Sequence, residues 1–130
     1  MNIALIADDG KKRLMENLCI AYRHILINHA LYATGTTGQI VEEAANLHVH
    51  KYLAGHLGGE RQLGAQISHN DIDLVIYLRD PQRTAPPLDI NTAARLCDVH
   101  NIPLASNLAT AEALLLALER GDLDWRNIVR

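Results

Sequence analysis

Short apolar runs alternate with segments of helical periodicity along the whole of this 130-residue chain. The clearest run, Leu74–Leu78, has no charged or amide side chain and is expected to be a central strand, buried on both faces. Ile3–Ala7 has the same character, and apolar residues recur at helical spacing through Lys12–His29. Strands and helices that alternate with short connections predict a parallel sheet with helices on both faces.

The same patterns assign the remaining elements. The expected strands are Ile3–Ala7, Leu31–Ala33, Val49–Leu53, Leu74–Leu78 and Pro103–Ala105. The expected helices are Lys12–His29, Ile40–Ala45, Arg61–His69, Asn91–His100 and Thr110–Arg120, the last ended by Gly121. No repeat, low-complexity segment or linker interrupts them. We therefore predict one α/β domain over residues 1–130, with three layers (α/β/α) and a mostly parallel sheet.

The composition narrows the classes of function. A content of 48% hydrophobic and 21% charged residues is ordinary for a globular protein. A formal net charge of −3 gives no electrostatic reason to expect nucleic acid or an anionic membrane as a partner. No signal peptide or membrane-spanning apolar run is present, so we expect a cytoplasmic protein. Cys19 and Cys97 lack metal-type spacing and are expected to be buried, reduced thiols.

Polar segments follow four of the expected strands. In a parallel sheet the carboxyl ends of the strands share one edge, and ligands bind beyond that edge. The segments are Asp8-Asp9, Thr34–Gly38, Arg79–Pro81 and Ser106-Asn107. Four polar segments at one edge favour a functional site there over four independent turns.

Thr34–Gly38 has the chemistry of an anion cradle. Its glycines let the backbone approach a ligand, its threonines supply hydroxyl donors, and the N–H groups that open the following helix point at negative charge. The alternative is an N-capped turn that binds nothing. A second glycine-rich segment, Gly55–Ala65, favours a site because it places Glu60 directly after the flexible Gly58-Gly59 pair.

Both segments resemble motifs of methylglyoxal synthases. Thr34–Gly38 is similar to their phosphate loop, and Gly58–Gln62 is similar to their catalytic Gly-Gly-Asp-Gln-Gln. The similarity runs through nearly the whole chain, at Asn2–Ala7, Arg79–Pro81, Arg95–His100 and Ile102–Ala105. It implies the methylglyoxal synthase fold, homohexamer assembly and the conversion of dihydroxyacetone phosphate to methylglyoxal and inorganic phosphate. It implies no metal and no organic cofactor.

The resemblance also implies roles for individual residues. The phosphate-binding positions of the family fall on Thr34, Thr36, Thr37, Lys12 and, as a backbone donor, Gly55. Lys12 stands between two other basic residues, so a solvated helix lysine is the alternative reading of it. The small partner implied is a phosphorylated substrate or inorganic phosphate.

The catalytic side departs from the family pattern. Glu60 stands where the family has its catalytic aspartate, Arg61 replaces a glutamine, and His56 replaces a proline. Glutamate keeps the carboxylate needed to remove a proton, but its extra methylene moves the basic oxygen by about 1 Å, a misplacement that can cost about 100-fold in rate. His56 can equally be a loop histidine that faces solvent.

The remaining departures concern the group that polarises the substrate carbonyl. The family's histidine in the loop after Asp80 has no counterpart here, while Asp9 and Asp80 are kept and Asp89 takes the place of a second aspartate. Asp8, which we group with the substrate-binding residues, stands where the family has another histidine. Either His56 or a neutral carboxylic acid such as Asp8 is then expected to replace the missing donor.

Three functions are compatible with this sequence. The first is a methylglyoxal synthase with Glu60 as its base. The second is an enzyme of the same fold that acts on another phosphorylated or polar substrate. The third is a non-catalytic anion- or effector-binding module, since the same fold serves as a regulatory domain of carbamoyl phosphate synthetase. Release of phosphate and methylglyoxal from dihydroxyacetone phosphate distinguishes the first from the other two.

Overall fold

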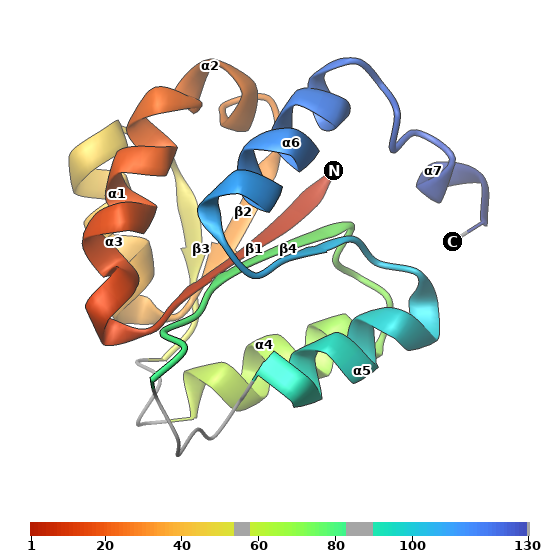
Figure 1. Cartoon of the computed structure of the whole chain (residues 1–130), viewed down its shortest axis with the longest axis horizontal. Helices are drawn as coiled ribbons and strands as arrows, with labels where there is room; N and C mark the ends of the chain where they lie inside the picture. The colour runs from red at the N-terminus through yellow and green to blue at the C-terminus, as the bar shows by residue number, and fades with distance from the viewer. Residues whose placement is uncertain (54–57, 83–89, 130) are drawn as a thin grey trace.

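The computed structural model describes residues 1–53, 58–82 and 90–129, and its centre is a sheet of five parallel strands (Figure 1). The strands are β1 (Asn2–Ala7), β2 (Ala30–Ala33), β3 (Val49–Lys51), β4 (Leu74–Leu78) and β5 (Leu104–Ala105). Their order across the sheet is β3-β2-β1-β4-β5, and every neighbouring pair is parallel. The predicted parallel sheet is confirmed, with Leu74–Leu78 as an inner strand beside the central β1.

Helices cover both faces of the sheet, as the alternating pattern predicted. They are α1 (Lys12–Ala21), α2 (Arg23–Leu26), α3 (Gly35–Ala45), α4 (Gly59–Ser68), α5 (Ile90–His100), α6 (Leu108–Glu119) and α7 (Arg126–Val129), with a 3-10 turn η1 (Asp9–Lys11) before α1. The helices α1, α2, α3 and α6 pack on one face, and α4 and α5 pack on the other. The fold is the expected three-layer α/β/α arrangement.

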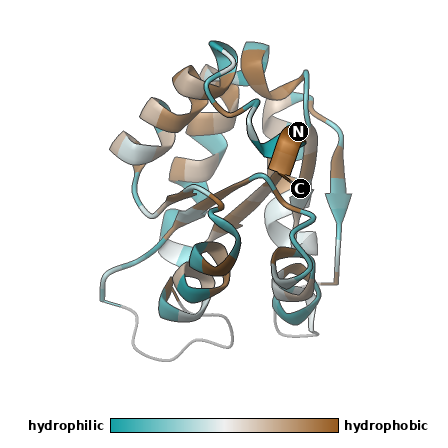
Figure 2. Cartoon of the chain, turned by 90° about the vertical axis from the view of Figure 1, so that its right-hand side faces the viewer, coloured by the Kyte–Doolittle hydropathy of each residue, from teal (hydrophilic) through white to brown (hydrophobic). Residues whose placement is uncertain are grey.

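The central strand has no polar face because it is covered on both sides. Ile3 and Leu5 join the core beneath α1, α3 and α6, while Ala4 and Ile6 join the core beneath α4 and α5. In Figure 2 the strands in the middle of the sheet accordingly run brown between the two groups of helices. Full burial of one aliphatic side chain stabilises the fold by about 1.5–3 kcal/mol. These residues therefore fix the sheet that positions the polar segments at its edge.

Several element bounds differ from the expected ones. The predicted helix Lys12–His29 is interrupted at Tyr22, where φ is −109° and ψ is 22°, and continues as the short α2. The helix expected over Ile40–Ala45 begins at Gly35, so most of the glycine-threonine segment forms its first turn. The strand β3 ends at Lys51, and the helix α7 was not predicted.

The two cysteines are buried and unpaired, as expected from their spacing. Cys19 lies on α1 and Cys97 on α5, each inside one of the two cores. Burial disfavours the thiolate and raises the pKa of each thiol to about 12. Within residues 1–53, 58–82 and 90–129, no helix has the length and apolar character needed to cross a membrane.

Candidate active site

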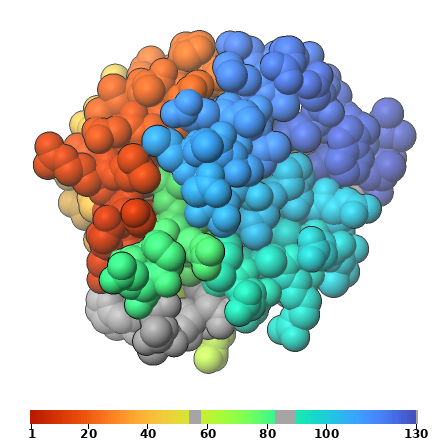
Figure 3. All heavy atoms as spheres, viewed as in Figure 1, coloured from red at the N-terminus to blue at the C-terminus, as the bar shows by residue number. Residues whose placement is uncertain are grey.

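The segments that follow β1 and β4 meet at the carboxyl edge of the sheet. Asp8 is buried, with 4% of its surface exposed, and its Oδ2 accepts a hydrogen bond from the Asp80 N–H at 2.7 Å. The Asp8 N–H donates to the Leu78 carbonyl at 3.2 Å. Gly10 passes close by, since a Cβ there would lie 3.3 Å from Asp80 Oδ2. Figure 3 shows the same junction from outside, where the green atoms after β4 adjoin the red atoms after β1.

The N-terminus of α3 presents backbone N–H groups at this edge. Thr34 precedes the helix, and its carbonyl accepts from the Gly38 N–H at 2.8 Å. The Gly35 N–H donates to the Leu53 carbonyl at 3.2 Å. The N–H groups of Thr36 and Thr37 have no acceptor within the described part of the chain. Such a helix start, with hydroxyls beside it, is a suitable site for an anion.

Lys12 is held against this helix start. Its Nζ donates to the Ala7 carbonyl at 3.2 Å and to Thr37 Oγ1 at 3.3 Å, and lies 3.4 Å from Asp9 Oδ1. Only 22% of its side chain is exposed, whereas that of Asp9 is fully exposed. These contacts favour the cradle interpretation of Lys12 over that of a solvated helix lysine.

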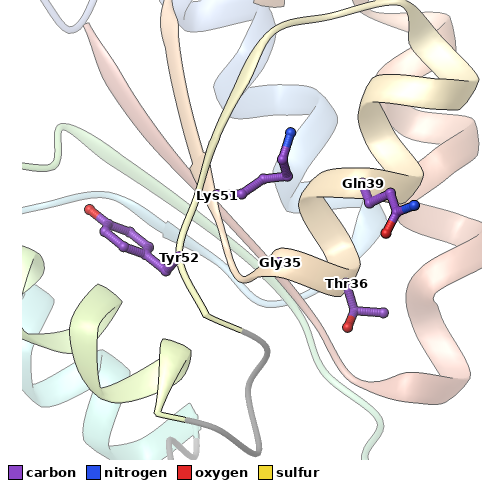
Figure 4. A pocket seen from close by; sticks show the side chains of 5 residues that line it. All are labelled: Gly35, Thr36, Gln39, Lys51 and Tyr52. Carbon is purple, nitrogen blue, oxygen red and sulfur yellow. The ribbon is translucent and has the colours of Figure 1, made fainter.

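A hollow of about 560 Å³ opens beside the first turn of α3. Gly35, Thr36, Gln39, Lys51 and Tyr52 line it. Figure 4 shows Thr36 and Gln39 on the helix, across from the segment that carries Lys51 and Tyr52. The hollow is large enough for a small phosphorylated molecule next to the donors of α3.

Lys51 is fixed at the border of this hollow by two contacts with α3. Its ammonium pairs with the Glu42 carboxylate, and this hydrogen bond is the main cause of the lowered pKa of Glu42. Its aliphatic stem lies so close to Gly38 that a Cβ there would be 2.5 Å from Lys51 Cγ. The absence of a side chain at Gly38 therefore makes room for the aliphatic part of Lys51 against α3.

Glu60 lies in the first turn of α4 and is half-buried. The helix begins directly after Gly58, whose φ of +105° is in the left-handed region that glycine adopts most readily. Arg61 has an exposed side chain. The helix expected over Arg61–His69 therefore begins two residues earlier, at Gly59, and only Gly58 of the glycine pair precedes it.

The structure gathers most of the predicted site residues at one edge, while some predictions lie outside the described residues. Those at the edge are Asp8, Asp9, Lys12, Thr34, Thr36, Thr37 and Asp80, with Glu60 at the start of α4. Gly55, His56 and Asp89 fall outside the described residues, so their roles stay predictions. Of the fourth polar segment, Asn107 caps α6, because its Oδ1 accepts from the Thr110 N–H at 3.0 Å.

Sequence reasoning missed residues that line or brace the site. Lys51, Tyr52 and Gln39 border the hollow, and the side chain of Gln62 accepts from the Leu53 N–H, two residues after β3. Of these missed residues, only Gln62 could have been suspected from the sequence, because it lies within the glycine-rich motif. Among the residues that the structure describes, no three His, Cys, Asp or Glu side chains gather in a group that could hold a metal ion.

The comparison with known proteins agrees with this geometry. A family model described as the MGS-like domain matches residues 16–106. A methylglyoxal synthase of Caldicellulosiruptor saccharolyticus is 60% identical over 130 residues, which cover 99% of this chain and 92% of that protein. The chain belongs to the methylglyoxal synthase family. Another methylglyoxal synthase, from Alkaliphilus metalliredigens, is 56% identical over 100% of this chain and 98% of its own length.

A solved structure extends the match to three dimensions. The crystal structure of the methylglyoxal synthase from Elizabethkingia anophelis NUHP1 matches this chain with a TM-score of 0.81 and 40% sequence identity. The match covers 88% of this chain and 76% of the other. The resemblance predicted from Thr34–Gly38 and Gly58–Gln62 is therefore confirmed at the level of family and fold.

Proposed function

We propose that this chain is a phosphate-eliminating lyase that converts dihydroxyacetone phosphate to methylglyoxal and inorganic phosphate. The observation that carries the proposal is the 60% identity to a methylglyoxal synthase over 99% of the chain. The cradle of Lys12 and the α3 N-terminus supports it, because a phosphorylated substrate needs these donors. A small phosphorylated substrate is thus the proposed partner.

In the proposed reaction the phosphate group is held by Lys12, the three threonines of the cradle and the Gly55 amide. Glu60 removes a proton from the hydroxymethyl carbon of the substrate, and the electron pair moves onto the carbonyl oxygen as an enediolate forms. Collapse of the enediolate breaks the carbon–oxygen bond to the phosphate, which leaves as inorganic phosphate. The remaining enol tautomerises to methylglyoxal, so the reaction needs neither a second substrate nor a cofactor.

The developing charge on the carbonyl oxygen requires a donor. We propose that His56 or a neutral carboxylic acid such as Asp8 supplies it, with Asp9, Asp80 and Asp89 completing the catalytic group. Asp8 is buried, and its Oδ2 accepts from the Asp80 N–H, which supports a place for this carboxyl group in the proposed set.

The proposal extends to the state of the whole protein. We treat residues 1–130 as one domain that assembles into a homo-oligomer, a hexamer by resemblance to the family, and that works in the cytoplasm. The buried, unpaired thiols of Cys19 and Cys97 support a reducing compartment. Sedimentation equilibrium tests the assembly, because a monomeric mass at micromolar concentration would exclude the hexamer.

The decisive experiment measures phosphate and methylglyoxal released from dihydroxyacetone phosphate. The wild type should release both in equal amounts. Glu60→Gln should lower kcat by about 100-fold or more, since a positioned general base contributes on the order of 100- to 10,000-fold. Phosphate binding should remain, because the cradle lies on other elements. Glu119→Gln is the matched control, since Glu119 is exposed at the last residue of α6.

Two results would contradict the proposal. A wild type that binds phosphate but releases neither product would favour another substrate or a binding module. Full activity of Glu60→Gln would move the base to Asp9 or Asp89. Turnover by Glu60→Asp then shows which carboxylate the pocket fits. If the pocket still fits the family's aspartate, this variant should keep or gain activity, and if it has been rebuilt around glutamate, the variant should lose activity.

A further inference from the structure

The peptide group of Leu53 links the two halves of the candidate site. Its carbonyl accepts from the Gly35 N–H at 3.2 Å, at the first residue of α3. Its N–H donates to the side-chain Oε1 of Gln62 at 3.1 Å, in the first turns of α4. One amide thus joins the helix that carries the phosphate donors to the helix that carries Glu60.

The hydrogen bond between Gln62 and the Leu53 N–H is not a consequence of packing the buried side of α4. The buried side of α4 is formed by Gly59, Leu63, Gly64 and Ile67, whereas Gln62 is exposed. At an exposed position any polar side chain is well solvated, but only one with an acceptor at this length reaches the Leu53 N–H. The hydrogen bond, made two residues after Glu60, therefore adds a specific link between α4 and the segment that follows β3.

We propose that Gln62 is a positioning residue that sets the distance between the Glu60 carboxylate and the phosphate cradle through the Leu53 peptide group. This inference rests on the proposed function, since it assigns Gln62 a part in placing the base of that reaction. An exposed hydrogen bond contributes little to stability, but a base displaced by 1 Å can cost about 100-fold in rate. The expected signature of Gln62 is a large effect on kcat with a small effect on folding.

A second glutamine provides an internal control. Gln66 lies one turn further along α4, and its side-chain oxygen accepts from the hydroxyl of Tyr52. It ties the same helix to the neighbouring residue of the same segment, but through a side chain rather than through the peptide that bonds Gly35. Loss of the Gln66 contact loosens α4 without breaking the link to the cradle.

The experiment compares Gln62→Leu, Gln62→Glu and Gln66→Leu with the wild type. Steady-state turnover of dihydroxyacetone phosphate gives kcat and KM, calorimetry gives the Kd of inorganic phosphate, and urea unfolding gives stability. Gln62→Leu should lower kcat by about 10- to 100-fold with the phosphate Kd near its wild-type value. Gln62→Glu keeps an acceptor of the same length and should restore most of kcat. Gln66→Leu should keep kcat near the wild-type value.

Four results would overturn the inference. An unchanged kcat in Gln62→Leu, beside an active wild type, would refute it and leave the proposed function intact. An equal loss of kcat in Gln66→Leu, or a parallel loss of phosphate binding and stability in Gln62→Leu, would show general loosening of α4. A wild type without turnover would refute the proposed function and this inference together, and wild-type turnover in the same series separates the two failures.

Discussion

Lys12 illustrates how single residues prepare the site before a ligand arrives. A lysine side chain has several rotatable bonds, and ordering it on binding costs free energy. Here the Ala7 carbonyl and Thr37 Oγ1 already hold the ammonium beside the first turn of α3. A phosphate bound as proposed would thus meet a positive charge that is largely in place.

Substitution of Lys12 should weaken phosphate binding. A hydrogen bond to a charged group contributes about 1.5–3 kcal/mol, so Lys12→Ala should raise the Kd of inorganic phosphate by about 10-fold or more. Calorimetric titration measures the change. Arg13→Ala is the control, because it removes an equal charge from an exposed side chain on the same helix. Equal weakening in both variants would reduce the effect to net charge and contradict the cradle.

Single residues also mark where sequence reasoning stops. The motif around Thr34–Gly38 predicted the cradle threonines, and the resemblance supplied Lys12. Lys51 was missed because alternation along an edge strand indicates only that a lysine faces away from the core. Its close contact with Gly38 depends on the packing of β3 against α3, which no local pattern encodes.

At the scale of elements, periodicity predicted the order of strands and helices but not every boundary. No glycine or proline stands between Arg13 and Ile27, and the apolar spacing continues through Tyr22, so the sequence carries no sign of the break between α1 and α2. Gly35 and Gly38 suggested a turn, because glycine is a poor helix former. Burial of Gly38 beneath Lys51 overrides that propensity, and the helix α3 begins earlier.

Gly38→Ala should destabilise the fold despite the better helix propensity of alanine. Alanine favours a helix by about 1 kcal/mol over glycine, while overpacking typically costs about 1–3 kcal/mol. The added methyl would lie 2.5 Å from Lys51 Cγ and 3.4 Å from Val49 Cγ1. We therefore expect a net loss of up to about 2 kcal/mol in the free energy of unfolding, measured in urea.

The double variant Gly38→Ala/Lys51→Ala tests the cause of that loss. Removal of the lysine stem makes room for the new methyl, so the double variant should be more stable than the sum of the single changes predicts. If the stability changes of the two single variants add exactly, the Lys51 side chain is not the reason that position 38 requires glycine.

For the whole molecule, the end of the sheet opposite the site is fastened by one buried cation. Arg126 of α7 is 1% exposed, and its Nε donates to Asp73 Oδ1 at 3.1 Å. Asp73 in turn accepts from the Asn2 N–H at 2.8 Å, at the start of β1. Further guanidinium bonds reach Asn70 Oδ1 and the carbonyls of Ile72 and His100. The α7 helix is thus tied to the amino ends of β1 and β4.

Arg126→Leu should be strongly destabilising, because it leaves the Asp73 carboxylate buried without its partner. Removal of one member of a buried pair costs about 3–5 kcal/mol, and urea unfolding measures the loss. The kcat of the protein that remains folded should not change, since the pair lies at the edge opposite the site. Arg120→Leu is the control, with an expected cost below about 1 kcal/mol because its pair with Asp122 is exposed. Similar costs in both variants would contradict the role of burial.

The topology of the sheet was the feature most readily predicted from the sequence. The buried Asp73–Arg126 pair was the least predictable. Five parallel strands follow from apolar runs such as Leu74–Leu78, which need only composition and length to be recognised. An arginine near the end of a chain is ordinarily placed at the surface. Arg126 is buried because two segments distant from it in the sequence, residues 70–73 and His100, place acceptors around its guanidinium, and that arrangement exists only after folding.

The placement of catalysis and anchorage at opposite ends of the strands has an evolutionary consequence. Substitutions that share no partner and lie far apart affect stability almost additively. Changes at the carboxyl edge, near Asp8 for example, are therefore expected to leave the stability contributed by the Asp73–Arg126 pair unaffected. A lineage with this architecture can try new pocket chemistry at one end while the other end keeps the protein folded.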